Sequence, residues 1–357
     1  MEKWRLIDSS PLTAAENMAR DKVMLTTRSR NITPDTLLFI EFAPHCALVG
    51  YHQAIELEIE EDYCLKHGIH INRRISGGGA IYMDEGVLGW AIFAGRNTPG
   101  IPANLDEMYA YLCTSVVVGL SKLGVQAKYR PKNDIEVDGR KISGTGGTAM
   151  GEAILYHGTV LVDFNVDIMI HCLKLPVKKL EDKQIQTYRQ RVTSLRGILG
   201  YKPSLPTIKN ALQEGFSEVL GGTFTKGSLA DEEEGLLNQE IPFFRSEEWI
   251  RGRKVPSQNS ALKVRDYKAP GGLIRVSVLL DQSRKRIKSA FITGDFFAYP
   301  ERSILDLEAF LKNSSSLSSD IHMNVLNFFN EHNVKIPGVD ADHIGEALCQ
   351  TISGTAR

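Results

Sequence analysis

A glycine-rich segment preceded by two arginines is the first place in this sequence that suggests anion binding. It is the run 73–81, RRISGGGAI. Consecutive glycines let a backbone turn tightly and approach a ligand, and their N–H groups can form a concavity for an anion. Guanidinium groups add charged donors in a fork geometry. Alone, such a run is more often ordinary turn geometry, and its spacing is neither that of a Rossmann turn nor that of a Walker motif.

A lysine beside a predicted hairpin is the second candidate. Asp138-Gly139 separates two strand-like runs, 134–137 and 140–143, which is a strong hairpin signal. Lys141 lies on the second run, where its ammonium group can approach a carboxylate or a phosphate. A lone exposed lysine is usually only solvated.

His157 is the third candidate. It lies in an apolar strand-like run, 154–164, where a lone histidine is usually structural, and Gly158-Thr159 follow it. Together the three segments resemble the lipoate–protein ligase family, which belongs to a wider group with biotin ligases and octanoyltransferases. The resemblance covers about residues 1–220. Its motifs are Arg73-Arg74-x-Ser76-Gly77-Gly78-Gly79-Ala80 with Asp84, Asn133-Asp134, Gly139-Arg140-Lys141-Ile142-Ser143-Gly144 and His157-Gly158-Thr159, with support from Glu16-Asn17-Met18-Ala19, Gly50-Tyr51-x-Gln53, Lys179 and Arg191-Val192.

The resemblance implies an ATP-dependent reaction in two steps. The lipoate carboxylate attacks the α-phosphorus of ATP, which gives lipoyl-AMP and pyrophosphate, and a lysine of a lipoyl-carrier protein then attacks the acyl adenylate. Two anions meet in the first step, so we expect Lys141 to be the catalytic cation between them. Asp134 is expected to face the nucleotide or its Mg²⁺. The other residues expected to bind lipoate or lipoyl-AMP are Arg74, Ser76, Gly77, Gly78, Gly79, Ala80, Ile81, Asn133, Ser143, Gly144 and His157.

Three departures from the family pattern bear on the acyl pocket. Val87 stands where ligases usually have asparagine, and Glu41 stands where an early strand often carries an aromatic residue. The run 144–148, GTGGT, is unusually rich in glycine and is expected to be mobile. Leu48 and Ile81 would still line an apolar slot for the lipoate chain. These changes suggest a specialised lipoyl carrier as the client.

Cysteine-dependent octanoyl transfer is the main alternative activity. One octanoyltransferase family of this kind carries its nucleophile just upstream of the lysine motif, but residues 129–135 contain no cysteine. Another branch carries it after the strand with the histidine, where Cys172 lies in an apolar helical stretch and is expected to be a small core residue. A biotin ligase fits the motifs less well. A catalytically weak lipoyl-carrier-binding protein is the alternative from a different class, and transfer from ready-made lipoyl-AMP would separate it from an active ligase.

Two domains are expected to position these residues. The first ~220 residues alternate strand-like and helix-like patterns, and the resemblance implies the mixed-sheet α/β catalytic domain of biotin and lipoate ligases. The predicted divisions are a catalytic domain at 1–225, a linker at 226–245, where apolar periodicity is lost around an acidic run, and a small α+β accessory domain at 246–357. Within the last, residues 273–280 alternate apolar and polar side chains and are expected to pair with 289–296.

Composition argues against several classes of partner. The 357 residues have a formal net charge of −1, which speaks against bulk electrostatic binding to nucleic acid or to an anionic membrane. The first residues lack the apolar core of a signal peptide, and no apolar run is long enough to span a bilayer. The five scattered cysteines suit a reducing compartment, so a cytoplasmic location is expected. Cys64, His67 and His70 are spaced like metal ligands, but they cross a predicted helix end, and a plain surface turn is the preferred interpretation.

Overall fold

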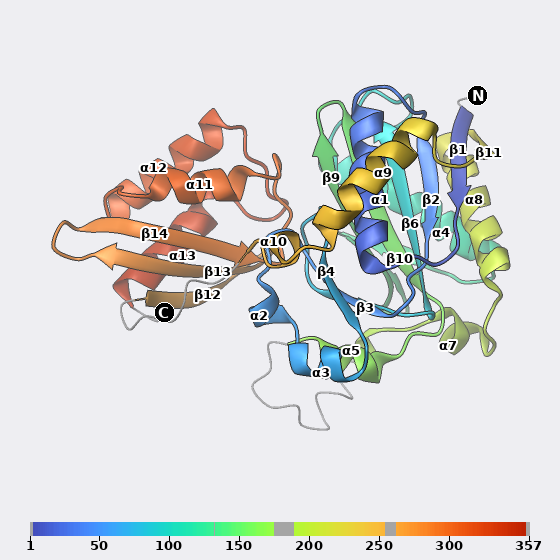
Figure 1. Ribbon diagram of the computed structural model, residues 1–357, viewed down its shortest axis with the longest axis horizontal. Coiled ribbons are helices and arrows are strands. Elements are labelled where there is room, and N and C mark those ends of the chain that lie inside the picture. Colours follow the sequence, from blue (N-terminus) through green and yellow to red (C-terminus); the bar gives the residue numbers. More distant parts are fainter. Residues whose placement is uncertain (1–2, 132, 175–188, 254–261, 355–357) are drawn as a thin grey trace. The chain divides into compact units, whose positions relative to one another are not determined.

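The computed structural model describes residues 3–131, 133–174, 189–253 and 262–354 (Figure 1). The chain divides into two compact units. The first unit contains Met1–Leu48, Ile59–Ile75 and Ile81–Ile250, and the second unit contains Val49–Glu58, Ser76–Ala80 and Arg251–Arg357. Two short segments from the N-terminal part of the chain therefore belong to the same unit as the C-terminal residues.

A mixed eight-stranded sheet is the frame of the first unit, in the order β11-β1-β2-β6-β10-β9-β8-β7. Its strands are β1 (Lys3–Asp8), β2 (Thr36–Ile40), β6 (Val87–Gly95), β7 (Lys128–Arg130), β8 (Asp134–Val137), β9 (Arg140–Met150), β10 (Ala153–Leu161) and β11 (Thr223–Lys226). β1 pairs in parallel with β2 and β11, and the other neighbouring strands pair antiparallel. The predicted mixed-sheet α/β class is confirmed.

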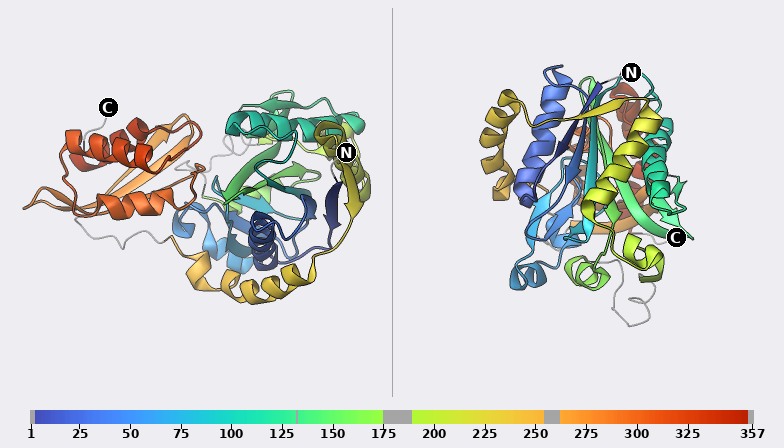
Figure 2. Two further views of the ribbon diagram at one scale, coloured as in Figure 1. Left: turned by 90° about the horizontal axis from the view of Figure 1, so that it is seen from above. Right: turned by 90° about the vertical axis from the view of Figure 1, so that its right-hand side faces the viewer.

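Helices cover both faces of this sheet, because its central strands are apolar on both sides. In β6, Trp90 and Ile92 belong to one hydrophobic core, whereas Ala91 and Phe93 belong to the core on the opposite face. The helices of the first face are α4 (Leu105–Lys122) and α8 (Leu205–Leu220), and those of the second are α1 (Ala14–Ser29) and α9 (Asp231–Phe244) (Figure 2). The middle of the sheet is therefore buried on both sides.

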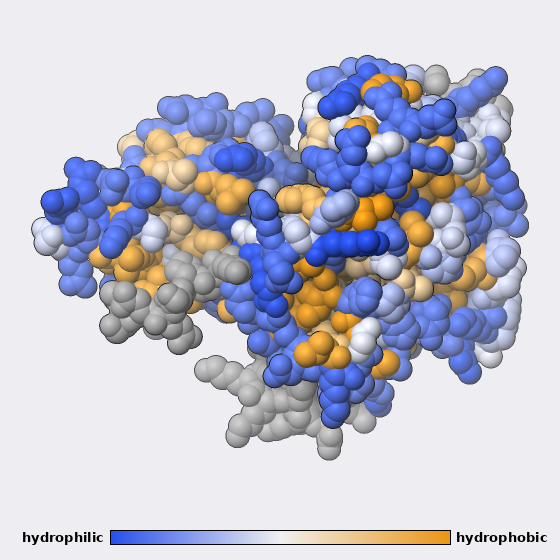
Figure 3. Space-filling model, viewed as in Figure 1, coloured by the Kyte–Doolittle hydropathy of each residue, from blue (hydrophilic) through white to orange (hydrophobic). Residues whose placement is uncertain are grey.

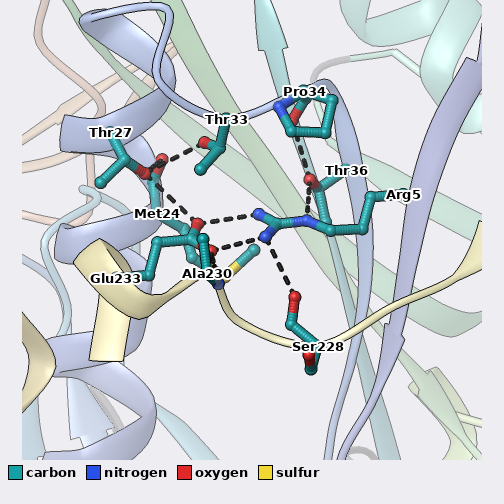
Figure 4. Close-up of polar contacts among 9 residues, drawn as sticks. All are labelled: Arg5, Met24, Thr27, Thr33, Pro34, Thr36, Ser228, Ala230 and Glu233. Carbon is teal, nitrogen blue, oxygen red and sulfur yellow. Dashed lines mark hydrogen bonds and ion pairs between the residues drawn. The ribbon is translucent and has the colours of Figure 1, made fainter. Parts of the chain in front are cut away.

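Helix α9 lies within residues 226–245, which the sequence analysis interprets as a linker. Its acidic run is the first helical turn, where negative charge is favourable, and its outer surface is largely hydrophilic (Figure 3). Glu233 is buried and accepts hydrogen bonds from two nitrogens of Arg5, at 2.5 and 2.8 Å (Figure 4). The Thr27 hydroxyl and the Ala230 N–H also donate to it, at 3.3 and 2.8 Å. These contacts make α9 a structural part of the first unit.

A small sheet in the order β4-β3-β5 completes the first unit. Its strands are β3 (Cys46–Val49), β4 (His70–Arg73) and β5 (Ile81–Met83). Beside it pack the short helices α3 (Glu61–Lys66) and α5 (Val166–Cys172), which are joined where the N–H of Glu60 donates to the carbonyl of Cys172 at 2.8 Å. Strand β4 leads directly into Arg74, the first predicted ligand-binding residue.

The second unit contains the short helix α2 (Ile55–Glu58) and, in its C-terminal part, an antiparallel three-stranded sheet with three helices. The elements of this C-terminal part are β12 (Leu262–Ala269), β13 (Gly272–Asp281), β14 (Arg286–Gly294), α11 (Ser303–Leu311), α12 (Ser318–Glu331) and α13 (Ala341–Ser353). Ile274, Val276 and Val278 alternate into the core, and β13 pairs with β14, so the predicted strand pair and the α+β character of this region are confirmed. In the described parts of both units, no helix has the length and apolar character needed to cross a membrane.

Candidate active site

The β8–β9 hairpin carries the predicted catalytic lysine. Asp138 and Gly139 form its turn with φ of 50° and 74°, the left-handed values that such a two-residue turn requires, so the predicted hairpin is confirmed. The strand pairing skips Ile142, which forms a bulge directly after Lys141. The Lys141 carbonyl also accepts the N–H of Thr193, at 2.8 Å. The bulge and this bond fix the position of the lysine backbone.

Lys141 faces a carboxylate. Its Nζ lies 2.6 Å from Asp134 Oδ1, as an ion pair without the alignment of a hydrogen bond, and its side chain is 42% exposed. Arg130 donates to the other oxygen of Asp134 at 3.0 Å, so two cations face this carboxylate. A Cβ on Gly144 would lie 2.8 Å from the ammonium nitrogen. Glycine at this position therefore leaves the space that the lysine uses.

Asn133 is held in place by Thr145. The Asn133 carbonyl accepts the N–H and the hydroxyl of Thr145, at 2.8 and 3.0 Å, and the Asn133 amide nitrogen donates to the Thr145 carbonyl at 3.0 Å. The Thr145 hydroxyl lies 2.7 Å from that of Tyr156, which lies 3.1 Å from Cys113 Sγ. Sequence reasoning missed Thr145 and Tyr156, whose only signal is that each adjoins a predicted site residue. The contact of Asn133 with the nucleotide stays a prediction.

Arg74 is buried in the first unit, and His157 on β10 is half-buried. Arg74 is 6% exposed and donates to the carbonyl of Leu48 at 3.1 Å. Burial lowers the pKa of Arg74 to about 10, which leaves it charged at neutral pH. Burial, and then the charge of Arg74, lower the pKa of His157 to about 3. At neutral pH the site therefore combines a buried cation with a neutral imidazole.

Arg73, the other arginine of the pair, has a structural role. It is buried and donates to the carbonyls of Trp249 and Ile250, at 3.2 and 3.1 Å. The indole N–H of Trp249 donates back to the Arg73 carbonyl at 3.1 Å. These bonds attach β4 to helix α10 (Glu247–Ile250). Of the two arginines, Arg74 is therefore the candidate for binding a ligand.

Adjacent strands bring several predicted residues together. Asp134 lies on β8, His157 lies on β10, and between these strands β9 carries Lys141, Ser143 and Gly144. The Ser143 hydroxyl is buried and has no hydrogen-bond partner among the described residues. Because buried hydroxyl groups are normally satisfied, Ser143 marks a place where a polar atom of a ligand fits.

The glycine segment belongs to the second unit. Gly78 has a φ of 91°, and its N–H donates to the carbonyl of Phe296 at 3.1 Å. The protein itself thus occupies the Gly78 amide that the sequence analysis assigns to a ligand. Ile81 begins β5 and pairs with Leu48. The ligand contacts expected for Ser76, Gly77, Gly79, Ala80 and Ile81 stay predictions.

The departures from the family pattern have structural explanations. Glu41 lies 2.6 Å from the ammonium nitrogen of Lys209, and Val87 is buried in the core beside α1. The expectation of a mobile run at 144–148 is wrong, because β9 pairs regularly with β10 from residue 145 onward. A Cβ on Gly147 would lie 2.7 Å from a carbonyl of β10, so close strand packing accounts for glycine there.

All five cysteines are free thiols, and all except Cys349 are buried. Cys172 ends α5 in the core, as predicted. A hydrogen bond with Cys64, and then burial, raise the pKa of Cys172, and the same bond lowers the pKa of Cys64. Lys179 lies outside the described residues. Within the described ranges, no group of three or more His, Cys, Asp or Glu side chains is suited to hold a metal ion.

Comparison with known families agrees with this geometry. A model of the lipoyl protein ligase A/B catalytic domain matches residues 13–217. The chain belongs to this family. The relationship to lipoate–protein ligases that the motifs indicate is confirmed. This lipoyl ligase A/B member is therefore an enzyme of a family that contains lipoate ligases and octanoyltransferases.

Similar proteins of this family differ in their reactions. The octanoyltransferase LipM of Kyrpidia tusciae is 28% identical over 271 residues, which cover 70% of this chain and 98% of that protein. A lipoate-protein ligase A structure with bound ATP is 27% identical with a TM-score of 0.62, and it covers 71% of this chain and 99% of its own. The structure of P. falciparum LipL1 in complex with lipoate covers 98% of this chain and 99% of its own with a TM-score of 0.76; at 18% identity it shows the fold alone. The names of the sequence relatives favour octanoyl transfer over ATP-dependent activation.

Proposed function

We propose that this family member is an ATP-dependent lipoate–protein ligase. The lipoate carboxylate displaces pyrophosphate from ATP to form lipoyl-AMP. The lysine amine of a lipoyl-carrier protein then forms an amide with the acyl carbon, and AMP and a proton are released.

The state of Cys46, Cys113 and Cys172 supports the choice of this reaction over thioester-dependent transfer. A thioester route needs an accessible thiolate nucleophile. Residues 129–135 contain no cysteine, and burial raises the pKa of Cys46 and brings that of Cys113 to about 11. Cys172 is buried too, with a raised pKa.

Two cations support activation at a phosphate. We assign Lys141 to the meeting point of the lipoate carboxylate and the α-phosphate, where positive charge stabilises the transition state. Arg74 is charged at neutral pH, and we assign it to oxygens of the carboxylate or phosphate. His157 and Ser143 are assigned to the adenylate as neutral hydrogen-bonding groups.

Mg²⁺ is expected as part of the substrate Mg·ATP. Mg²⁺ is usually held by one or two carboxylates together with phosphate oxygens. Asp134, the predicted ligand, is already faced by Lys141 at 2.6 Å and by Arg130 at 3.0 Å. As it stands, this carboxylate does not fit a resident cation, and Asp134 is better explained as the partner that orients Lys141 before ATP arrives.

The test is a lipoylation assay with purified full-length protein, lipoate, Mg·ATP and a panel of lipoyl-carrier proteins, followed by intact-protein mass. A lipoyl mass gain that requires ATP would support the proposal and identify a client. Acyl transfer from octanoyl-carrier protein without ATP would replace it with the transferase activity. Inactivity in both assays on all carriers would point to a carrier-binding protein.

Octanoyl transfer is the second candidate, because of Cys64 and the names of the relatives. The hydrogen bond from Cys172 lowers the pKa of Cys64, as a nucleophile requires. Cys64 is buried, however, so this route also needs helix α3 to open. If octanoyl transfer is observed and Cys64→Ser abolishes it in a folded protein, this second candidate is correct.

A further inference from the structure

The second unit shapes a loop that the sequence assigns to ligand binding. Its segments Val49–Glu58 and Ser76–Ala80 lie within the family match at residues 13–217, yet they pack with the C-terminal residues. The partner of the glycine loop Ser76–Ala80 is the segment 294–297, Gly-Asp-Phe-Phe. The conformation of this loop therefore depends on a part of the chain more than two hundred residues later.

The backbone of Phe296 is the closest partner of the glycine loop. Its carbonyl accepts the N–H of Gly78 at 3.1 Å. A Cβ on Gly77 would lie 2.4 Å from the same oxygen and 3.0 Å from the Cα of Phe297. Since real Cβ atoms do not approach oxygen so closely, any residue other than glycine at position 77 must push the loop away from Phe296.

His52 connects the other short segment to the same place. Its ring stacks on that of Phe296, with centroids 5.2 Å apart and planes 25° apart, and its carbonyl accepts the N–H of Gly294 at 3.3 Å. The N–H of the preceding residue, Tyr51, donates to the carbonyl of Ser76 at 2.9 Å. His52 and Phe296 are both buried. Together these contacts hold the glycine loop between the two segments.

An ion pair fastens the end of the His52 segment. Arg275 of β13 lies 3.0 Å from Glu58 and 2.7 Å from Asp266, and its side chain is largely buried. Removing only one partner of such a largely buried ion pair is strongly destabilising, because it leaves the other charge without its countercharge. The segment is thus attached to the C-terminal sheet at both of its ends.

We propose that Phe296 and His52 are positioning residues: with the Gly78 amide engaged by Phe296, they hold the rest of the glycine loop in the conformation that binds the anionic group of the substrate. This inference rests on the proposed function for the identity of that group, the carboxylate of lipoate or a phosphate of ATP. It assigns to the Gly-Asp-Phe-Phe segment a role in substrate affinity that acts through the loop.

The experiment uses full-length Phe296→Leu and Gly77→Ala, with Phe328→Leu as the matched control. Phe328 belongs to the same hydrophobic core, but its ring packs at a tilt against Phe310 instead of against His52. Amide hydrogen exchange over residues 76–80 reports the loop without relying on activity. Lipoate-dependent ATP–pyrophosphate exchange gives KM for lipoate and for ATP, and kcat. In both test variants we expect the exchange rate of the loop amides and one of the two KM values to rise roughly tenfold, while kcat stays within about threefold of wild type. In the control variant we expect neither the loop exchange nor the KM values to change.

Each outcome decides between the inference and its alternatives. Unchanged loop exchange in Phe296→Leu and Gly77→Ala would overturn the positioning role. Equal effects in Phe328→Leu would also overturn it, since general loosening of the core would then be the cause. Faster loop exchange in the test variants, in a wild-type protein without ATP-dependent activity, would support the loop contacts and refute the proposed function instead.

Discussion

The end of strand β4 and the β8–β9 hairpin each present one cation of the candidate site, and the fold holds the two in opposite ways. Arg74 is 6% exposed and bonded to a backbone carbonyl, whereas the Lys141 side chain is 42% exposed and paired with a carboxylate. Burial ties Arg74 to the stability of the first unit. Lys141 is exposed, so the stability of the first unit should depend little on it, because exposed ion pairs contribute little to the free energy of unfolding. Substitutions should therefore separate chemistry at Lys141 from binding and stability at Arg74.

The largest effect on activity is expected from Lys141→Ala. Removing a cation from the point where charge develops should lower the rate of lipoyl-AMP formation by about 10²–10³-fold. The free energy of unfolding should change by less than about 0.5 kcal/mol. ATP–pyrophosphate exchange and urea unfolding measure the two quantities. Lys128→Ala is the matched control, because Lys128 is also an exposed hairpin lysine near a carboxylate; normal exchange by Lys141→Ala would remove the lysine from its role.

Arg74→Ala should affect stability and activity together. The substitution removes a buried side chain and leaves the carbonyl of Leu48 without this donor, so we expect a loss of about 3 kcal/mol in the free energy of unfolding. The KM for lipoate or ATP should also rise by about tenfold or more. Urea unfolding and substrate titration of the folded fraction measure both. An unchanged free energy of unfolding would show that burial does not distinguish the two cations as we argue.

Glu233 is a third charged residue, and it tests the effect of burial at a place that takes no part in the proposed reaction. Glu233 is buried against Arg5 far along the chain, with no predicted site residue among its partners. Glu233→Gln should cost about 2 kcal/mol, because it leaves a guanidinium short of its countercharge, while activity per folded molecule stays within about twofold. Glu232→Gln, on the exposed side of the same turn, is the control. Loss of activity without loss of stability would contradict a purely structural role.

The neutral imidazole beside Arg74 predicts a pH dependence of stability. The pKa of His157 is about 3 in the folded protein and 6.5 in its ordinary state, so between these values the unfolded chain binds the extra proton. Stability from this group is complete above pH 6.5 and is lost as pH falls toward 3. Wild type should lose up to about 2 kcal/mol between pH 7.5 and pH 5 relative to His157→Gln.

Urea unfolding of both proteins at these two pH values is the measurement. Asp21, whose pKa burial raises to about 7, contributes with the opposite sign, since its stabilisation is lost as pH rises above its ordinary value. That contribution is common to both proteins and cancels in the difference. Parallel pH profiles of wild type and His157→Gln would mean that His157 is not held neutral by its surroundings.

The sequence could predict features that depend on contacts between residues close together in the chain, but not features that depend on contacts between distant residues. The Asp138-Gly139 hairpin and the alternation of β13 are local patterns, and the family motifs lie within short runs. The pairing of Glu41 with Lys209 joins residues 168 positions apart, and that of Arg5 with Glu233 joins residues 228 positions apart. No periodicity in a single sequence reports such contacts. For the same reason the acidic turn of α9 resembled a linker, and the hold of the C-terminal segment on the glycine loop could not be foreseen.

The smallest effect on activity is expected from Cys172→Ser. This substitution sharpens the comparison of the two cations, because it changes a buried group that the ligase reaction does not use. Cys172 lies in the core beside Cys64, and a serine there replaces one small side chain by another of similar shape. The hydroxyl loses little if it keeps the hydrogen bond, so we expect a cost of about 1 kcal/mol or less and ATP-dependent lipoylation within about twofold of wild type. Cys113→Ser is the control, since Cys113 is equally buried but lies in a different place, in the core beneath α4. Complete loss of acyl transfer in folded Cys172→Ser, with Cys113→Ser active, would show that the thiol and not the two cations carries the reaction.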